Sequence, residues 1–350
     1  MSLYIKGMGN ISPQHTFGHE VLPQAILEHT SSRMMCHEPD YAEWLDVKTL
    51  RRMSRIVKMG VTCALYALRD AGISKPHAII TGTAFGCMED TGMFITKLVE
   101  NQEQALNPTP FINSTHNTIG SQIALLLPCE GYNQTYTQRA FSFENALTDA
   151  LLMGKEHETH SILVGGIDET TDISFEIMKR FGFYAATPSN LKLYQNRKGT
   201  IQGEGAAFFV VSAQKSDGDD VLIRNVKTIY KPSADEEVDQ KLRAFMESNG
   251  LTNDDIDLIL VGKNGVERID ASYDNFIRRN FTSTPVGVYK HICGEYSTAN
   301  AFAVWLAASI LKTGKVSPSV TEKDVRQLKR ILVYNQFFGN HHSFIILEAC

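Results

Sequence analysis

The segment Ala299 to Leu311, "ANAFAVWLAASIL", most constrains how this chain can fold, because its hydrophobic side chains lie on nearly every side of a predicted helix. A helix at a protein surface shows a single apolar stripe instead. A helix that is apolar all round must be buried on all sides, and a layer of helices between two sheets provides such a place. The longest uninterrupted apolar run of the chain, Ala301 to Ala308, is far shorter than the about 20 residues that a membrane span needs.

Three features of the first half of the chain recur in the same order in the second half. They are a helix followed by a buried strand, a Gly-bearing turn before a long apolar helix, and a strand ending in a polar turn. The matching segments are 53–82 with 236–262, 114–131 with 289–314, and 161–169 with 330–338. We therefore predict an α/β fold of two similar halves, 1–170 and 205–350, with a connecting segment at 171–204. The polar segment 212–220, between two apolar strands, is predicted to be a hairpin-like loop.

The bulk composition excludes several functional classes. A chain of 350 residues with 43% hydrophobic and 21% charged residues is typical of a globular protein with a large core. A net charge of −5 gives no basic field for nucleic acid or for a membrane surface. The six cysteines are scattered without a Cys-x-x-Cys pair, which argues against a zinc site and favours the cytoplasm. The start of the chain has no long apolar stretch, so no signal peptide is expected.

The segment 133–169 has a layout in which many α/β enzymes place a nucleophile. A strand-like run, 134–137, ends in a tight segment, a helical pattern follows, and a second apolar strand closes on Gly165 and Gly166. The tight segment 139–143, "RAFSF", holds no Cys. The sequence thus predicts an elbow without the expected thiol.

The segment 196–211, "NRKGTIQGEGAAFFVV", resembles a signature of the thiolase-fold condensing enzymes, and specifically of the β-ketoacyl-acyl carrier protein synthases. It matches the pattern Arg-x-Gly-(x)3-Gly-Glu-Gly-Ala at Arg197, Gly199, Gly203, Glu204, Gly205 and Ala206. The stretches "SILVGGIDE", "GLTNDDIDLILVG", "YKHICGE" and "VYNQFFGN" resemble further motifs of the family, in order, from about residue 50 to the end. The resemblance implies a five-layer αβαβα fold and a two-fold dimer.

The chemistry that the resemblance implies is decarboxylative Claisen condensation. A Cys at a helix N-terminus takes an acyl chain from a carrier-protein thioester, because the helix dipole and a nearby His favour the thiolate. Two His then stabilise the oxyanion that forms when malonyl loses CO2, and a Lys supports them. We predict no cofactor and no metal ion, since the pair His341 and His342 has no third ligand at a useful spacing.

The family pattern places none of these three catalytic side chains on this sequence. Ala140 falls at the position of the Cys, Gly262 at that of the first His and Glu295 at that of the second His. A carboxylate would repel a forming oxyanion, so Glu295 is a poor substitute. The Lys is retained as Lys290. Three matched departures predict a scaffold that is kept without the condensation chemistry.

The elbow carries larger side chains than the family pattern. Phe143 replaces a Gly and is predicted to fill space where an acyl chain would otherwise pass. Ser142 is interpreted as the N-cap of the following helix rather than as a nucleophile. The residues predicted to line the vestigial site or the acyl path are Ala140, Phe141, Ser142, Phe143, Lys290, Glu295, Phe337 and Phe338.

Two cysteines are alternative nucleophiles. Cys87 follows the first buried strand and Cys293 lies two residues before Glu295, so either one could pair with a His at 291, 341 or 342. The competing interpretation of both is a small buried apolar residue. His116 falls on a segment that lines the dimer interface in the family, and we interpret it as a hydrogen-bonded structural residue.

Three functional hypotheses follow. The first is a non-condensing subunit, similar to the chain-length factors of polyketide and polyene systems, which pairs with an active ketosynthase and shapes the path of an acyl chain from an acyl carrier protein. Those factors often carry Gln at the Cys position, whereas this chain has Ala140. The motif "FSFE" resembles proteins that accompany aryl polyene or dialkylresorcinol pigment enzymes.

The second hypothesis is an active 3-oxoacyl synthase or acyltransferase that uses Cys87 or Cys293. The third is an acyl-binding or structural homodimer.

Overall fold

The strands form one continuous hydrogen-bonded sheet in a computed structural model that describes residues 2–185, 188–196, 198–323, 325 and 327–350. Arg197 of the family signature lies outside the described residues. The strand order is β3-β2-β4-β5-β1-β6-β10-β9-β7-β8. The strands are β1 (Leu3–Ile11), β2 (Ala78–Gly82), β3 (Tyr132–Tyr136), β4 (Ile162–Asp168), β5 (Gly205–Ser212), β6 (Val221–Tyr230), β7 (Leu258–Val261), β8 (Val286–Val288), β9 (Arg330–Phe337) and β10 (His341–Ala349).

Strand pairing repeats between the two ends of this sheet. β2 pairs in parallel with β3 and β4, and then β4–β5 and β5–β1 are antiparallel. β7 likewise pairs in parallel with β8 and β9, and then β9–β10 and β10–β6 are antiparallel. The prediction of two similar halves is therefore confirmed. The halves meet through the pairs Leu3 with Ile223 and Tyr4 with Leu222.

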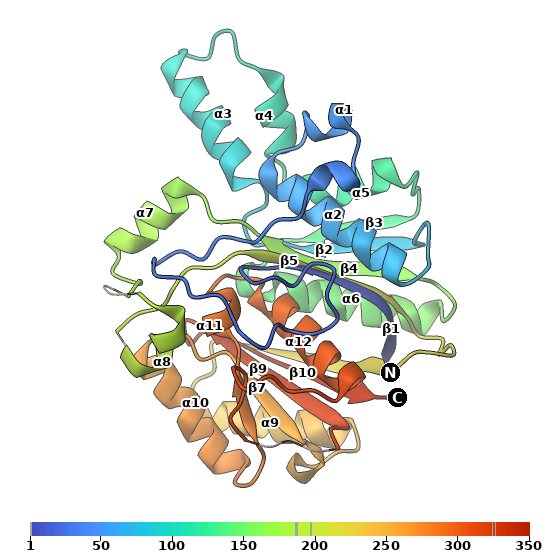
Figure 1. Ribbon diagram of the computed structural model, residues 1–350, viewed down its shortest axis with the longest axis vertical. Coiled ribbons are helices and arrows are strands. Elements are labelled where there is room, and N and C mark those ends of the chain that lie inside the picture. Colours follow the sequence, from blue (N-terminus) through green and yellow to red (C-terminus); the bar gives the residue numbers. More distant parts are fainter. Residues whose placement is uncertain (1, 186–187, 197, 324, 326) are drawn as a thin grey trace.

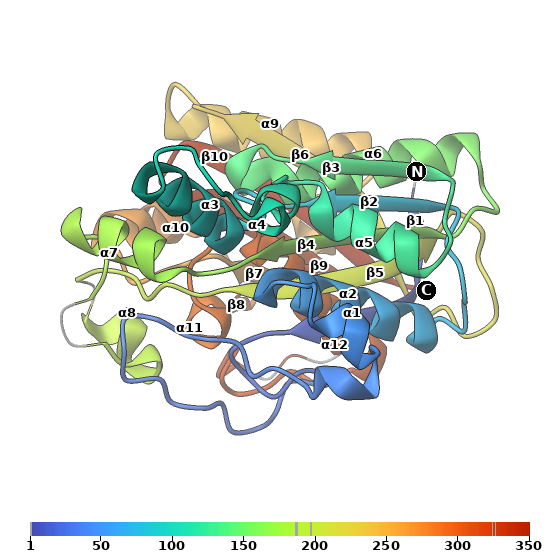
Figure 2. The ribbon, with the colours of Figure 1, turned by 90° about the horizontal axis from the view of Figure 1, so that it is seen from above.

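Helices separate and cover the two halves of the sheet, which gives the expected five layers (Figure 1). The helices α6 and α12 lie between the halves, α2 and α5 cover the first half, and α9 and α10 cover the second (Figures 1 and 2). The α-helices are α1 (Val47–Leu50), α2 (Arg55–Asp70), α3 (Met88–Glu100), α4 (Pro108–Asn113), α5 (Thr118–Leu126), α6 (Ser142–Glu156), α7 (Asp172–Arg180), α8 (Leu193–Asn196), α9 (Asp235–Ser248), α10 (Glu267–Asn280), α11 (Lys290–Cys293) and α12 (Ala299–Thr313). None of the helices in the described part of the chain has the length and hydrophobicity to cross a bilayer.

The helix α12 lies where its sequence predicted. Every residue from Ala299 to Leu311 is buried, and the helix packs against strands of both halves. The predicted helix over 53–71 is also present, since α2 ends before Gly72, whose φ of +66° suits a residue without Cβ.

Two predictions about local connections are wrong. The loop 212–220 does not close a hairpin, because β1 inserts between β5 and β6. The helix that corresponds to α12 is α6, since each follows an edge strand of its half, whereas α5 precedes β3. The limits 1–170, 171–204 and 205–350 stay a prediction, and strand pairing groups β5 with β4 and β1.

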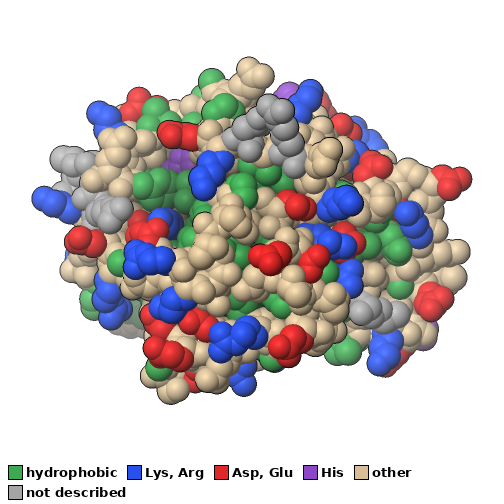
Figure 3. Space-filling view, turned by 90° about the horizontal axis from the view of Figure 1, so that it is seen from below, with side chains coloured by type: hydrophobic (Ala, Val, Ile, Leu, Met, Phe, Trp, Pro, Cys, Tyr) green, Lys and Arg blue, Asp and Glu red, His purple; other side chains and the backbone are tan. Residues whose placement is uncertain are grey.

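Charged side chains of both signs are interspersed on the face seen in Figure 3, and hydrophobic side chains show between them. This mixture agrees with a net charge of only −5. Charged and carboxyl groups also lie inside the molecule, among them the buried Lys290–Glu295 ion pair and Glu144 on the first turn of α6.

Candidate functional site

The elbow between β3 and α6 is strained at Arg139. Residues Arg139–Phe141 form a 3-10 turn that leads into α6, and Arg139 has a φ of +52°. A non-glycine residue in this left-handed region costs of order 1–3 kcal/mol, and such residues cluster at functional sites. Arg139 is exposed whereas Ala140 is buried. The strained residue therefore exposes its guanidinium group, and the next residue in the sequence, Ala140, is buried.

A cavity of about 390 Å³ lies beside the elbow. Its volume falls within the range of small-molecule sites, and its wall is mostly aromatic and aliphatic. The lining residues are Phe85, Met88, Arg139, Asp168, Glu169, Ser174, Ile177, Met178, Phe183, Tyr184, Thr200, Gln202, Gly203, Glu295, Tyr296, Ser297, Phe337 and Phe338. Among these described residues there is no Cys and no His.

Glu295, at the predicted position of the second His, is held in a buried ion pair. Lys290 Nζ lies 2.6 and 2.7 Å from its two carboxylate oxygens, and Lys290 is fully buried. Asn264 Nδ2 donates a third hydrogen bond of 2.7 Å to Glu295. Both oxygens of Glu295 are thus occupied by donors from the protein. This group cannot donate to an oxyanion.

Gly262, at the predicted position of the first His, has no room for a side chain. A Cβ atom there would lie 2.1 Å from Asn335 Oδ1 and 2.9 and 3.0 Å from the hydroxyl groups of Tyr273 and Tyr289. The residue that reaches Glu295 from the same loop is Asn264, which sequence reasoning missed. Its only signal in the sequence is its place in a polar loop after a buried strand.

The other predicted lining residues separate into two groups. Phe337 and Phe338 line the cavity, as does Glu295. Phe143 is fully buried in the core, its ring centroid 6.1 Å from that of Phe209, and it does not line the cavity. Its predicted role in an acyl path stays a prediction. Phe141 is half-buried outside the cavity, against His341.

Ser142 does not cap α6, so that prediction is wrong. Its Oγ donates to the carbonyl oxygen of Arg139 at 2.7 Å, and the residue is fully buried. The reason is the 3-10 turn before the helix, which already places Ser142 in helical backbone geometry and leaves Phe141 at the N-cap.

The two alternative nucleophiles are poorly placed for catalysis. Cys87 and Cys293 are both fully buried, and neither lines the cavity. Burial raises the pKa of Cys87 to about 12 and raises that of Cys293 strongly, so both thiols stay protonated near neutral pH. Burial also lowers the pKa of the neighbouring His291 to about 4. The cysteines therefore pack as small apolar residues.

The remaining predicted histidines have structural surroundings. His342 Nδ1 lies 3.0 Å from the hydroxyl of Tyr334, and His342 is buried. His116 is exposed beside Gly86, and its ring makes no hydrogen bond with a described residue, contrary to the predicted structural role. His341 lies near the elbow, with its ring centroid 4.8 Å from that of Phe141.

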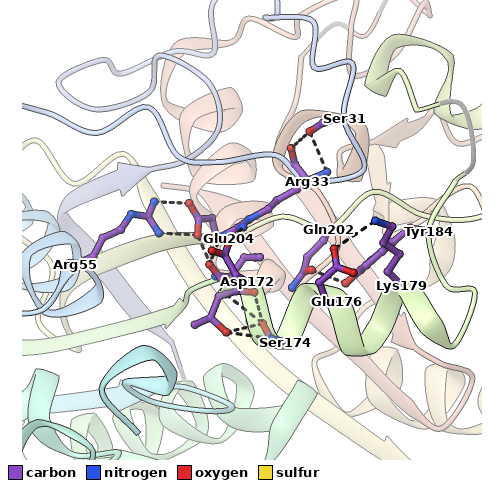
Figure 4. A network of polar contacts seen from close by, with 12 residues as sticks. Ser31, Arg33, Arg55, Asp172, Ser174, Glu176, Lys179, Tyr184, Gln202 and Glu204 are labelled. Carbon is purple, nitrogen blue, oxygen red and sulfur yellow. Dashed lines mark hydrogen bonds and ion pairs between the residues drawn. The ribbon is translucent and has the colours of Figure 1, made fainter. Parts of the chain in front are cut away.

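The glutamate of the family signature, Glu204, joins three segments of the chain (Figure 4). It is fully buried and forms a bidentate pair with Arg55, one bond of which is 2.8 Å long. It also accepts the backbone N–H groups of Cys36 at 2.8 Å and Thr170 at 3.0 Å. Glu204 itself does not line the 390 Å³ cavity, so its hydrogen bonds hold the fold together rather than facing that cavity.

The last residue of β4 and the residue after it are acidic, and sequence reasoning missed both as site residues. Asp168 is buried and accepts from the N–H groups of Ala84 at 2.8 Å and Thr298 at 3.1 Å, so it ties the ends of β2 and β4 to the start of α12. Glu169 lines the cavity next to it. Burial raises the pKa of Asp168 to about 6 and that of Glu169 to about 7.

A third carboxyl group, Glu144, is buried on the first turn of α6. Its Oε1 accepts from Asn300 Nδ2 and, at 2.9 Å, from Ser343 Oγ, whereas Oε2 has no hydrogen-bond partner among the described residues. Burial raises the pKa of Glu144 to about 7. The unpartnered oxygen gives a physical reason for this value, because only the protonated form escapes the desolvation of a charge.

We expect Glu144 to make the protein less stable as pH rises from about 4.5 to 7. The folded protein holds this proton more tightly than the unfolded chain, so the free energy of unfolding falls through this window, by roughly 3 kcal/mol for a pKa shift of this size. Glu144→Gln keeps the acceptor for Asn300 and stays neutral. Urea unfolding at pH 5 and pH 8 should show that this variant loses less stability than wild type. Equal losses would contradict the assignment.

Comparisons with known proteins agree with this architecture. Residues 16–216 match the model of the beta-ketoacyl synthase, N-terminal domain, which is more than half of the chain. No curated protein matched in sequence. Similar solved structures are the ishigamide ketosynthase/chain length factor, with a TM-score of 0.83 and 18% identity, and a beta-ketoacyl synthase from Burkholderia phymatum STM815, with a TM-score of 0.82 and 17% identity; each match covers 100% of this chain and 99% of the other.

A third similar structure is a ketosynthase in complex with its chain length factor from Xenorhabdus doucetiae, with a TM-score of 0.78, 13% identity and coverage of 100% of this chain and 98% of the other. At these identities the structural matches show the fold alone. The family is shown by the matched domain model, together with the signature around Glu204. This chain belongs to the beta-ketoacyl synthase family.

Proposed function

We propose that this chain is a non-condensing partner subunit that resembles a chain-length factor and pairs with an active ketosynthase. The observation that carries the proposal is the elbow. Its strained residue is Arg139, and the next residue in the sequence is the buried Ala140. The described residues that line the adjoining cavity include neither a thiol nor an imidazole. An acyl chain could lie in such a cavity, but no group there could carry it covalently as a thioester.

The shape of the interior supports a role in accommodating an acyl chain. A second cavity, of about 780 Å³, lies between the α3–α4 hairpin and the start of α7, and Met88 lines both cavities. Its apolar lining residues include Met93, Phe94, Leu106 and Ile173. A flexible Met side chain between two apolar cavities is suited to adjust to chains of different length.

The free edge of the sheet supports pairing with a second subunit. β3 is the last strand on its side of the sheet, and exposed hydrophobic side chains flank it: Leu125 on α5, Tyr132 on β3 and Leu152 on α6. An open strand edge and exposed apolar side chains are features that a partner normally covers. We commit to an active ketosynthase as the partner, by analogy with the complex from Xenorhabdus doucetiae.

Intact mass spectrometry after incubation with an acyl-carrier thioester tests the absence of covalent chemistry. We expect no acyl adduct on this chain, because Cys87 and Cys293 are buried and protonated. A Cys-containing ketosynthase is the positive control. An adduct that disappears on Cys87→Ser or Cys293→Ser would establish the acyltransferase alternative instead.

Co-expression with a Cys-containing ketosynthase from the same gene neighbourhood tests the pairing. We expect a stable heterodimer by size-exclusion chromatography with light scattering. Leu152→Asp should disrupt it, whereas Val47→Asp, at an equally exposed position on α1, should not. A homodimer alone would favour the homodimeric hypothesis. We also propose, from the motif "FSFE", that the pathway makes an aryl polyene or a dialkylresorcinol, and the functions of the neighbouring genes would test this. We propose the cytoplasm as the location of the protein.

A further inference from the structure

Three histidine rings are stacked face to face where α6 ends and the strands β2 and β4 begin. His160 is the middle ring: its centroid lies 4.5 Å from those of both His77 and His157, and the ring planes are inclined by only 7° and 17°. His77 directly precedes β2, and His157 follows the last residue of α6. This histidine stack thus joins two segments that lie far apart in the sequence through side chains that change charge near neutral pH.

Hydrogen bonds beside the stack depend on a neutral His77. The N–H of Ser161 donates to His77 Nδ1 at 3.1 Å, and the N–H of His77 donates to the carbonyl oxygen of Ser161 at 2.8 Å. Because a backbone N–H can only donate, Nδ1 must be unprotonated in this arrangement. Ser161 Oγ, 3.0 Å from the same Nδ1, could accept an added proton, but the N–H of Ser161 would still lose its acceptor.

No carboxylate offsets a positive charge on the middle ring. Burial lowers the pKa of His160 from its ordinary value of 6.5, and the charges of His77 and His157 lower it further. The other charged residues on the segments around the stack do not contribute to this shift; they are Lys75, Glu130, Lys155, Glu156, Glu158, Lys215 and Asp217. Protonation of the stack therefore places like charges together without a counterion.

We infer that the histidine stack is a pH-operated latch, which holds the segment 157–161 against the start of β2 while its rings are neutral and releases the segment when they are protonated. One charged ring can stack on a neutral one, but two charged rings 4.5 Å apart repel each other. The closed form loses stability as the pH falls below about 6.5, the ordinary pKa of histidine, because the open segment binds protons more readily.

The release would be local, because a second attachment of the segment contains no titrating group. The carbonyl oxygen of Glu158 accepts from the N–H of Gln214 and from Ser212 Oγ, each at 3.0 Å. The segment would therefore separate from β2 while it stays joined to the end of β5. The elbow lies at the other end of α6, a helix of about 20 Å, so the latch does not depend on the proposed function.

Hydrogen–deuterium exchange with mass spectrometry at pH 7.5 and pH 5.5 tests the latch, with a chelator present to remove metal ions. Protection is corrected for the chemical exchange rate at each pH. We expect it to fall at least about fivefold at pH 5.5 in peptides over 74–80 and 157–164, the factor for two unit charges 4.5 Å apart in water. Peptides of the buried helix α12 should keep their protection.

Substitutions in the stack separate its effect from that of other histidines. His160→Phe keeps a flat ring in the middle but takes up no proton, so it should lose most of the response. His19→Phe, at an exposed histidine outside the stack, is the matched control and should respond as wild type does. In NMR of the histidine side chains, the pKa of His160 should lie below 6.5 and rise in His157→Phe, because one neighbouring charge is removed.

Each contrary result has a distinct meaning. Equal protection of the wild type at both pH values would overturn the latch, as would a full response in His160→Phe or a lost response in His19→Phe. A fall in protection that extends to α12 would show acid unfolding of the whole chain and would overturn a local release. An ordinary pKa for His160 would contradict the stacking of the three rings in solution.

Discussion

Replacing Lys290 by Met should destabilise the protein by about 3–5 kcal/mol, because it leaves the carboxylate of Glu295 buried without its cation. Lys290 is fully buried, and its Nζ contacts both oxygens of Glu295 at 2.6 and 2.7 Å. Only the hydrogen bond from Asn264 would remain. Urea unfolding at pH 8 measures the loss.

The double variant Lys290→Met/Glu295→Gln provides the control for this expectation. It removes both charges while Gln keeps an acceptor for Asn264, so it should recover most of the stability that Lys290→Met loses. If the single variant cost less than about 1 kcal/mol, the ion pair would be solvated rather than buried as described. A double variant no more stable than the single one would show that Lys290 acts through packing instead.

Gly203→Ala should be the most damaging single methyl that can be added near the site, with a cost above about 4 kcal/mol or a failure to fold. A Cβ atom at Gly203 would lie 1.9 Å from the carbonyl oxygen of Cys293 and 2.6 Å from the Cα of Gly294. These are backbone atoms, so no rotamer change can relieve the overlap. Soluble expression and the urea midpoint measure the effect.

Gly250→Ala is the matched control. Gly250 has a φ of +67°, but a Cβ atom there meets no other atom within 4 Å. Its substitution should cost only about 1 kcal/mol, which is the backbone strain of a left-handed residue. Similar losses for Gly250→Ala and Gly203→Ala would mean that backbone conformation, rather than the close approach of two chain segments, governs the effect at Gly203.

The layered fold could be predicted from sequence because its signals are local and strong. The apolar surface of 299–311 required burial on all sides, and the recurring order of strands indicated two halves. The pairing of β1 between β5 and β6 could not be predicted in this way. Its partners lie about 200 residues away in the sequence, and the polar segment 212–220 carries no information about a strand inserted from the N-terminus.

Whether the site lacks the catalytic residues of the family stays a prediction. The assignments of Ala140, Gly262 and Glu295 to the catalytic positions follow from the resemblance to the family's motifs. The partners that occupy the site do not: Asn264 lies in a loop without a distinguishing motif, and the left-handed geometry of Arg139 depends on the turn between β3 and α6. The same turn explains why Ser142 lies within the helix rather than at its cap.

The close approach of Gly203 and Gly294 affects what a match to the family signature indicates about a protein. Gly203 and Glu204 both act as scaffold residues, the first by letting two backbones touch and the second by holding Arg55 and two loops. Neither residue depends on whether position 140 bears a thiol. A signature built from such residues therefore identifies how a chain is folded and is silent on whether it turns over substrate. Classifying members of this family by activity requires inspection of the elbow itself.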